Sequence, residues 1–305
     1  MAKYEWSEVV MSIEGGAQYS GHPTAYVRFA KCNFQCKGFN NPDGLDTTST
    51  IVLGFNPAAY DDIYSIPLIT RGCDSIYSWD EKFKHMWKTG DEKHLTADVL
   101  AVLPQHNFIT PSKQRIILSL TGGEPTLRIK FWIPLLRELY THGMRHVLIE
   151  TNCSVPLQAK HIDALYNFAY DTKAYGSPVR ITWSNSPKLR GSGEQHNEAI
   201  RPDIALAQRQ WNGQDVLQDA DYPFDQYFKF VCGPTVEDFK EVYDVMEEYY
   251  VAGIPRDVPV YIMPTACTEE QQHEVAAKVA KKCMQDGYIY CHRIQNSVFG
   301  NGVGT

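Results

Sequence analysis

Residues 28–36 read RFAKCNFQC and place Cys32 and Cys36 directly after the apolar run 25–30. Such a run is typical of a β-strand, so both thiols are expected at the carboxyl end of that strand. Thiolates are the usual protein ligands of iron–sulfur clusters, and two of them at this spacing can reach one inorganic centre. A cluster that also binds a small molecule needs three cysteines and one open position. The sequence therefore predicts that a third cysteine ligand lies elsewhere in the chain.

Length and composition bound the class of protein. The chain has 305 residues, of which 43% are hydrophobic, and it can bury a large core. A formal charge of −7 argues against direct binding to nucleic acid, because phosphate contacts need clustered Lys and Arg. The sequence contains neither an apolar run of transmembrane length nor the apolar core of a signal peptide at its start, so we expect a cytoplasmic protein. In a reducing compartment its eight cysteines are expected as thiols or ligands, not disulfides.

An alternation of strands and helices begins near residue 115. The strands expected besides 25–30 are 116–120, 146–150, 179–184, 227–232, 259–263 and 288–294, and the helices that follow the first five are 131–141, 159–170, 199–210, 236–250 and 269–285. This pattern predicts an α/β fold, a partial (β/α) barrel of about six or seven mostly parallel strands with outer helices. We expect a single domain, 1–305, with loop insertions at about 37–72 and 189–222. In such barrels function gathers at the carboxyl ends of the strands.

A Cys-x3-Cys pair after one strand and the segment LTGGEP (120–125) after the next resemble the radical S-adenosylmethionine (SAM) enzymes. That superfamily usually has a third cysteine three residues after the second, where this chain has Phe39. The segment GCDSIYSW (72–79) resembles the one that begins at the third cysteine in the 7-carboxy-7-deazaguanine synthase (QueE) family. The resemblance therefore implies Cys73 as the third ligand, with an insertion between it and Cys36.

The same resemblance implies the other site residues. SAM-binding residues are expected in LTGGEP, IETN (149–152) and SNSPK (184–188), namely Gly122, Gly123, Glu124, Glu150, Asn152, Ser184, Ser186 and Lys188. Ser75 stands where the family has a threonine whose hydroxyl joins Mg²⁺, and serine keeps that oxygen. Substrate contacts are implied for Glu14, Gly16, Arg28, Arg293 and Gln295.

Two of the substrate contacts depart from the family, and the others rest on an additional argument. SIEGG (12–16) resembles the family's SIQGEG, but Glu14 replaces its glutamine and Gly16 its glutamate. The guanidinium of Arg28 can grip a substrate carboxylate. Arg293 and Gln295 are expected on one face of the last strand, because side chains alternate along a strand.

The implied activity is that of a lyase which converts 6-carboxy-5,6,7,8-tetrahydropterin to 7-carboxy-7-deazaguanine, with loss of ammonia, in deazapurine (queuosine-type) biosynthesis. The implied cofactors are a 4Fe-4S cluster, S-adenosyl-L-methionine and Mg²⁺, and the implied partners are a pterin substrate, a flavodoxin-type electron donor and a second copy in a homodimer. Two alternatives stay open. CNFQC (32–36) followed by Phe39 and Asn40 also resembles the activating enzyme of an anaerobic ribonucleotide reductase, and Phe39 motivates a cluster-less protein that binds a pterin or SAM.

Overall fold

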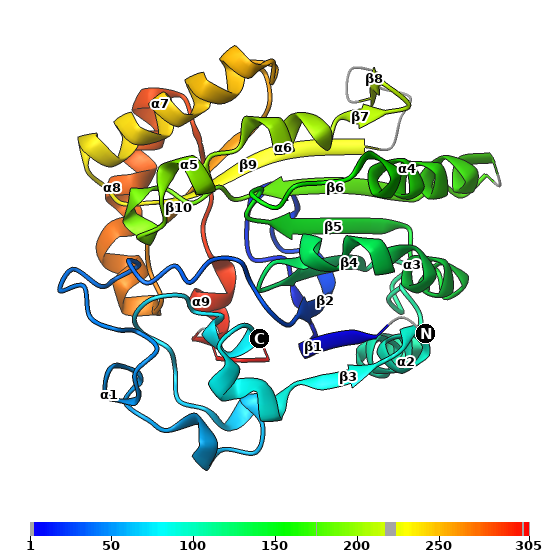
Figure 1. Cartoon of the computed structure of the whole chain (residues 1–305), viewed down its shortest axis with the longest axis horizontal. Helices are drawn as coiled ribbons and strands as arrows, with labels where there is room; N and C mark the ends of the chain where they lie inside the picture. Colours follow the sequence, from blue (N-terminus) through cyan, green and yellow to red (C-terminus); the bar gives the residue numbers. More distant parts are fainter. Residues whose placement is uncertain (1–2, 175, 217–223, 301, 305) are drawn as a thin grey trace.

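The computed structural model describes residues 3–174, 176–216, 224–300 and 302–304 (Figure 1). Its centre is a nine-stranded sheet in the order β11-β10-β9-β6-β5-β4-β2-β1-β3. The strands are β1 (Tyr4–Ile13), β2 (Pro23–Phe29), β3 (Lys88–Gly90), β4 (Ile117–Gly122), β5 (His146–Thr151), β6 (Arg180–Asn185), β9 (Phe224–Cys232), β10 (Val260–Pro264) and β11 (Ile289–Tyr290). The neighbours from β2 to β11 pair in parallel, whereas β1 pairs antiparallel with β2 and β3 antiparallel with β1. The predicted, mostly parallel α/β sheet is confirmed.

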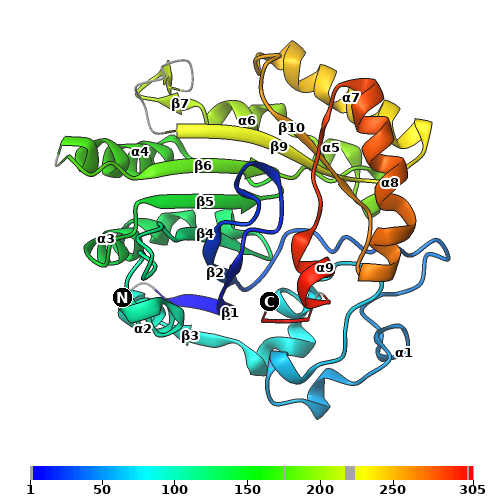
Figure 2. The same cartoon turned by 180° about the vertical axis from the view of Figure 1, so that it is seen from behind.

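Helices surround this sheet, as Figures 1 and 2 show from opposite sides. The longer ones are α2 (Glu92–Val102), α3 (Trp132–Thr141), α4 (Ala159–Ala174), α7 (Val236–Ala252) and α8 (Glu269–Asp286), and the short ones are α1 (Thr50–Leu53), α5 (His196–Ala199), α6 (Pro202–Ala207) and α9 (Ile294–Phe299). A small two-stranded sheet, β7 (Gln210–Trp211) and β8 (Gln214–Asp215), stands apart. The ends of α7 are fixed locally, because Thr235 begins it with a capping box and Gly253 ends it in the left-handed conformation.

The strands alternate between a helix-covered face and an inner face. On β4 to β6, Leu120, Ile149 and Trp183 belong to the large apolar core under α3 and α4. Polar neighbours such as Glu150 and Ser184 point the other way and line a cavity. This period-two pattern places polar side chains on the inner face near the carboxyl ends of the strands, whereas Ile117, Leu148 and Tyr227 form a small apolar cluster on the same face. The polar part of the inner face carries the site.

Two sequence predictions about elements are wrong. The expected helix 199–210 is two short helices, α5 and α6, because Pro202 cannot donate a main-chain hydrogen bond and starts a new helix instead. The expected strand 288–294 pairs only over β11, after which the Ile294 amide donates to the carbonyl of Gly15 and the chain turns into α9. The hydrogen bond between Ile294 and Gly15 therefore places the segment after β11 next to the loop after β1.

Residues 37–72, which are predicted to be an insertion, form a loop with small elements, α1 and short 3₁₀ turns. It has a separate apolar cluster, in which Phe55, Ile63 and Ile69 pack against Tyr77 and Phe83. The second insertion, 189–222, carries α5, α6, β7 and β8, but residues 217–222 lie outside the described residues. The single-domain assignment stays a prediction.

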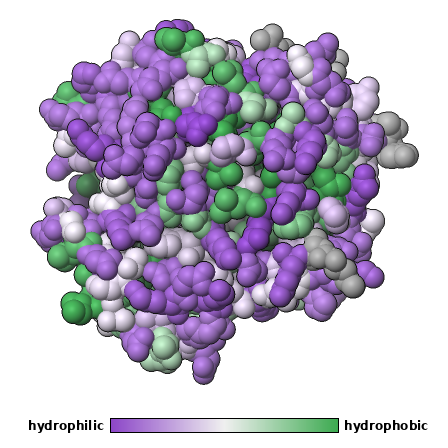
Figure 3. Space-filling view, in the orientation of Figure 1, coloured by the Kyte–Doolittle hydropathy of each residue, from purple (hydrophilic) through white to green (hydrophobic). Residues whose placement is uncertain are grey.

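The described surface is mixed in character. Figure 3 shows a face dominated by hydrophilic side chains, with hydrophobic ones scattered between them. Among the described residues, no helix combines the length and the apolar composition that crossing a membrane requires.

Candidate active site

A cavity of about 280 Å³ lies at the carboxyl ends of the parallel strands. Its size suits a small molecule better than a lone ion. Every site residue predicted from the sequence lines this cavity except Glu124. The fold therefore brings together residues that lie as far apart in the sequence as Glu14 and Gln295.

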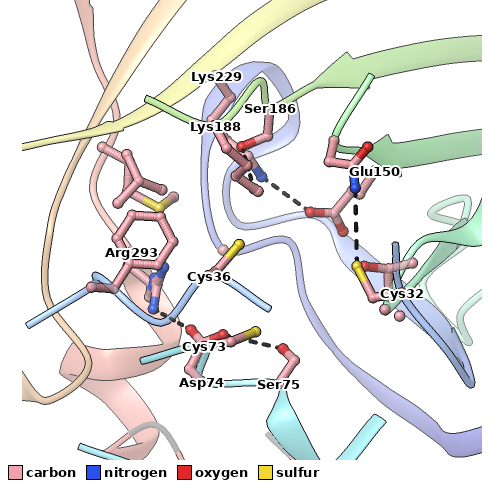
Figure 4. Close-up of a pocket in the computed structure, with 18 of the residues that line it drawn as sticks. Cys32, Cys36, Cys73, Asp74, Ser75, Glu150, Ser186, Lys188, Lys229 and Arg293 are labelled. Carbon is pink, nitrogen blue, oxygen red and sulfur yellow. Dashed lines mark hydrogen bonds and ion pairs between the residues drawn. The ribbon is translucent and has the colours of Figure 1, made fainter. Parts of the chain in front are cut away.

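Three thiols, those of Cys32, Cys36 and Cys73, surround one part of the cavity (Figure 4). Cys73 reaches it because the insertion closes on itself: the Gly72 amide donates to the carbonyl of Phe39 at 2.8 Å. The loop from Cys32 to Cys36 is held at Cys36 by Glu194, whose carboxylate accepts a hydrogen bond from the Cys36 amide at 2.6 Å. Cys73 thus lines the same cavity as Cys32 and Cys36, although it lies 37 positions after Cys36 in the sequence.

Burial keeps these thiols protonated unless a metal binds them. Burial and the nearby Glu124 raise the pKa of Cys32 to about 12, and burial also raises the pKa values of Cys36 and Cys73, so a bound metal centre is needed to hold them as thiolates. Over the described ranges, no three ligand-type side chains gather tightly enough for a single metal ion. A 4Fe-4S cluster poses a different requirement, because each thiolate binds a different iron atom and the sulfurs stand apart around it.

Gly122, the last residue of β4, and Gly123 after it lie close against the end of β2 and the loop that follows β2. A Cβ atom on Gly123 would lie 1.9 Å from the carbonyl oxygen of Lys31, and one on Gly122 would lie 2.3 Å from that of Phe29. Gly122 also has a φ of +149°, which side-chain-bearing residues rarely adopt. These glycines are therefore needed to pack the loop after β4 on the loop that carries Cys32.

Glu124 is placed differently from the prediction. Its buried carboxylate accepts hydrogen bonds from the Thr126 amide, the Thr151 hydroxyl and the Asn152 amide, at 3.0, 2.7 and 2.7 Å. It lies behind the cavity wall, with both oxygens occupied, and joins the loops after β4 and β5. Its contacts position Asn152, and its carboxylate does not line the cavity.

Two arginines frame Ser75 on one side of the cavity. Arg28 donates from Nη1 to the Ser75 hydroxyl at 3.1 Å and from Nε to Glu8 at 2.9 Å. The Ser75 hydroxyl in turn donates to Asp74 at 3.1 Å, and Arg293 donates to the other oxygen of Asp74 at 2.6 Å. Burial opposes the ionisation of Asp74, but Arg293 and Arg28 hold its pKa below the ordinary value. Asp74 is a site residue that sequence reasoning missed, although its place directly after Cys73 could have indicated it.

The opposite wall carries a buried ion pair. Lys229 Nζ lies 3.0 Å from Glu150 Oε2, and the Ser119 hydroxyl donates to Glu150 Oε1 at 2.8 Å. Burial alone would raise the pKa of Glu150, but Lys229 lowers it. The segment KFV (229–231) ends a strand and could have indicated Lys229, but only the structure pairs it with Glu150. Next to them, the buried side chain of Ser184 faces the cavity.

The C-terminal contacts arise differently from the prediction. Arg293 and Gln295 do not share a strand face, since Arg293 precedes α9 and Gln295 lies within it. The amide of Gln295 donates to the carbonyl of Ile13 at 2.8 Å, and a Cβ on Gly15 would lie 1.5 Å from its Oε1. Gly16 packs in the same way on Cys291, whose sulfur would be 2.5 Å from an added Cβ. Gly16, Arg293 and Gln295 still line the cavity. They come together because the loop after β1 packs against the segment from Cys291 to Gln295.

No protein-family model matches the chain. The chain does match curated proteins named 7-carboxy-7-deazaguanine synthase, including three from Rhodopirellula baltica, Halobacterium salinarum and Methanopyrus kandleri. The one from Rhodopirellula baltica is 23% identical over 299 residues, covering 98% of this chain and 88% of its own, and the one from Halobacterium salinarum is 23% identical over 301 residues, covering 98% and 91%. The one from Methanopyrus kandleri is 30% identical over 162 residues, 52% of each chain.

The chain is a relative of the 7-carboxy-7-deazaguanine synthases. A solved structure titled QueE from Escherichia coli covers 95% of this chain and 93% of its own, with a TM-score of 0.48 and 14% identity. The resemblance drawn from the motifs is confirmed by the matches of full length.

Proposed function

We propose that this protein is a radical SAM 7-carboxy-7-deazaguanine synthase, a carbon–nitrogen lyase that converts 6-carboxy-5,6,7,8-tetrahydropterin to 7-carboxy-7-deazaguanine with loss of ammonia. The observation that carries the proposal is that Cys32, Cys36 and Cys73 line one cavity. The hydrogen bond between Gly72 and Phe39 closes the intervening loop and so brings Cys73 close to the other two cysteines. The alignment with curated synthases over 98% of the chain supports the same function.

The residues would divide the work as follows. The three thiolates would hold a 4Fe-4S cluster, and Ser75, with Asp74 beside it, would offer oxygen atoms to Mg²⁺, which needs few protein ligands. When bound, the cluster and SAM supply the radical chemistry that removes a hydrogen atom from the substrate. The proposed SAM-binding wall consists of Gly122, Gly123, Glu150, Asn152, Ser184, Ser186 and Lys188, and the proposed substrate contacts are Glu14, Gly16, Arg28, Arg293 and Gln295. Glu124 would act through Asn152, which it positions.

Iron content tests the cluster first. Iron and acid-labile sulfide are measured in anaerobically reconstituted wild type, Cys73→Ala and Cys267→Ala. Cys267 is the matched control, because it too is a buried thiol on the cavity wall. We expect about four irons in the wild type and the control, and loss of the cluster in Cys73→Ala. A wild type without iron would refute the enzyme and leave the cluster-less binding protein, whereas loss in Cys267→Ala alone would transfer the ligand role to Cys267.

Turnover separates the remaining alternatives. The reconstituted enzyme is incubated with SAM, a chemical reductant and 6-carboxytetrahydropterin, and 5′-deoxyadenosine and 7-carboxy-7-deazaguanine are quantified. We expect 7-carboxy-7-deazaguanine to form in a SAM-dependent way without any protein partner. Because loss of ammonia leaves the oxidation level of the substrate unchanged, 5′-deoxyadenosine should appear in smaller amount than 7-carboxy-7-deazaguanine. An activating enzyme would need its large partner protein and would leave the pterin unchanged.

Two partner proposals accompany this function, a flavodoxin-type electron donor and a homodimer. Their support is the family resemblance of the sequence. Light scattering of the purified protein tests the homodimer, and turnover driven by reduced flavodoxin in place of a chemical reductant tests the donor.

A further inference from the structure

Glu14 occupies an unusual position for a carboxyl group. Its side chain is buried in the loop after β1, with the residue only 2% exposed, and it lines the cavity. Its Oε2 lies 3.0 Å from the hydroxyl of Tyr26. The same hydroxyl lies 3.1 Å from the carbonyl oxygen of Ile13 and 3.3 Å from the amide nitrogen of Gln295, which also donates to Ile13.

The number of protons available for these contacts depends on whether Glu14 is ionised. The amide of Gln295 supplies two, one to Ile13 and one to the Tyr26 oxygen, and the hydroxyl of Tyr26 supplies one. If Glu14 were ionised, the Tyr26 proton could go either to Glu14 or to Ile13, and the other contact would join two acceptors. If Glu14 carries a proton and donates it to Tyr26, then Tyr26 donates to Ile13 and every contact is a hydrogen bond.

The surrounding charges favour the same state. The ion pair of Glu150 with Lys229 is already neutral as a unit, so an ionised Glu14 would add an uncompensated negative charge to a buried wall. Burial, followed by the charge of Glu150, raises the pKa of Glu14 to about 8, although Lys229 and hydrogen bonds from Tyr26 and the Gly16 amide oppose this. The titratable groups that face it are Tyr26 on β2, Glu150 on β5, Tyr227 and Lys229 on β9, and Cys291 after β11.

We propose that Glu14 keeps its proton in the folded protein and, as a neutral carboxyl, determines substrate choice by binding an uncharged polar ring edge, such as that of a reduced pterin. This inference rests on the proposed function, which supplies the pterin. A neutral wall accepts ring N–H and C=O groups without the cost of burying a charge, whereas a ligand with a cationic group would find no counter-ion at Glu14. Glu14 is a specificity-determining residue in this proposal.

The test compares wild type with Glu14→Gln, which keeps the shape of a protonated glutamate and cannot ionise. Equilibrium binding of 6-carboxytetrahydropterin without SAM is measured anaerobically between pH 6 and 9.5. We expect the wild-type affinity to fall by up to about tenfold per pH unit above its transition, and that of Glu14→Gln to stay nearly flat. Ionisation of the pterin itself affects both proteins equally. Equal pH dependence in the two proteins would overturn the inference.

An infrared measurement keeps the two proposals separable. The carbonyl stretch of a protonated carboxyl should appear at pH 7 in the difference between the wild-type and Glu14→Gln spectra, and this difference band should disappear at pH 9.5. The difference is needed because burial also raises the pKa of Glu124, which both proteins contain. If the wild type binds no pterin at any pH, the proposed function fails, while this band still decides the protonation of Glu14. Absence of the band at pH 7 refutes the inference whatever the binding result.

Discussion

Arg28→Met tests whether the arginine beside Ser75 is held in place by a buried ion pair. Arg28 Nε lies 2.9 Å from Glu8 Oε2, and the Glu8 side chain is 2% exposed. Tyr77 also donates to Glu8 Oε2, at 3.2 Å, whereas Glu8 Oε1 has no hydrogen-bond partner within the described part of the chain. Removal of the guanidinium would therefore leave a buried carboxylate with a single donor.

The expected cost follows from that geometry. Breaking a buried ion pair by removing one partner costs about 3–5 kcal/mol, and the lower end applies here because the Arg28 side chain is 19% exposed. The double variant Glu8→Gln with Arg28→Met keeps neither charge of this pair, so it should recover all but roughly 1–2 kcal/mol of the loss. The two changes should thus couple strongly in a double-mutant cycle.

Urea unfolding of the cluster-free proteins at pH 7 under anaerobic conditions measures these free energies. Arg180→Met is the matched control, because its partner Asp225 is 30% exposed and such pairs contribute only about 0–1 kcal/mol. A cost below about 1 kcal/mol for Arg28→Met would refute the reasoning, as would a double variant no more stable than the single one. If the double variant is stable but binds pterin weakly, the substrate role of Arg28 is separated from its structural role.

Three further predictions concern stability. Gly123→Ala should prevent native folding or cluster assembly, because its Cβ would lie 1.9 Å from the Lys31 carbonyl oxygen. The control Gly191→Ala has no atom within 4 Å of its Cβ, so its thermal unfolding and iron content should match those of the wild type. Burial and nearby positive charge lower the pKa of His146 to about 3, so wild-type stability should fall relative to His146→Gln by up to ~1.4 kcal/mol per unit as pH drops from 6.5 to 3; parallel acid-unfolding curves would contradict this. The pKa of Glu14 is raised from 4.5 to about 8, so the wild type should lose stability relative to Glu14→Gln by up to ~1.4 kcal/mol per unit as pH rises over that interval, and urea unfolding with no such trend would argue against a buried neutral acid.

Sequence reasoning worked best where the information is local. The strands at β4, β5, β6, β9 and β10 begin and end within three residues of the predicted positions, because continuous apolar runs bounded by turn residues fix them. It failed at the chain's end, where the pattern of residues 288–294 resembles a strand but the contact of Ile294 with Gly15 turns the chain into α9. Competition between a sheet neighbour and a distant loop cannot be read from a window of residues.

The sequence predicted most of the residues that gather at the site, although it missed Asp74 and included Glu124. Motifs that follow parallel strands must meet at one edge of the sheet, so the positions of Cys32, Gly122, Glu150 and Lys188 along the chain already implied a common cavity. Only the tertiary structure decided what each side chain does there. It buried Glu124 behind the wall, paired Glu150 with Lys229 and placed Glu14 against Tyr26. The physical reason is that protonation and hydrogen-bond partners depend on burial and on charges brought from distant parts of the chain, which local sequence does not encode.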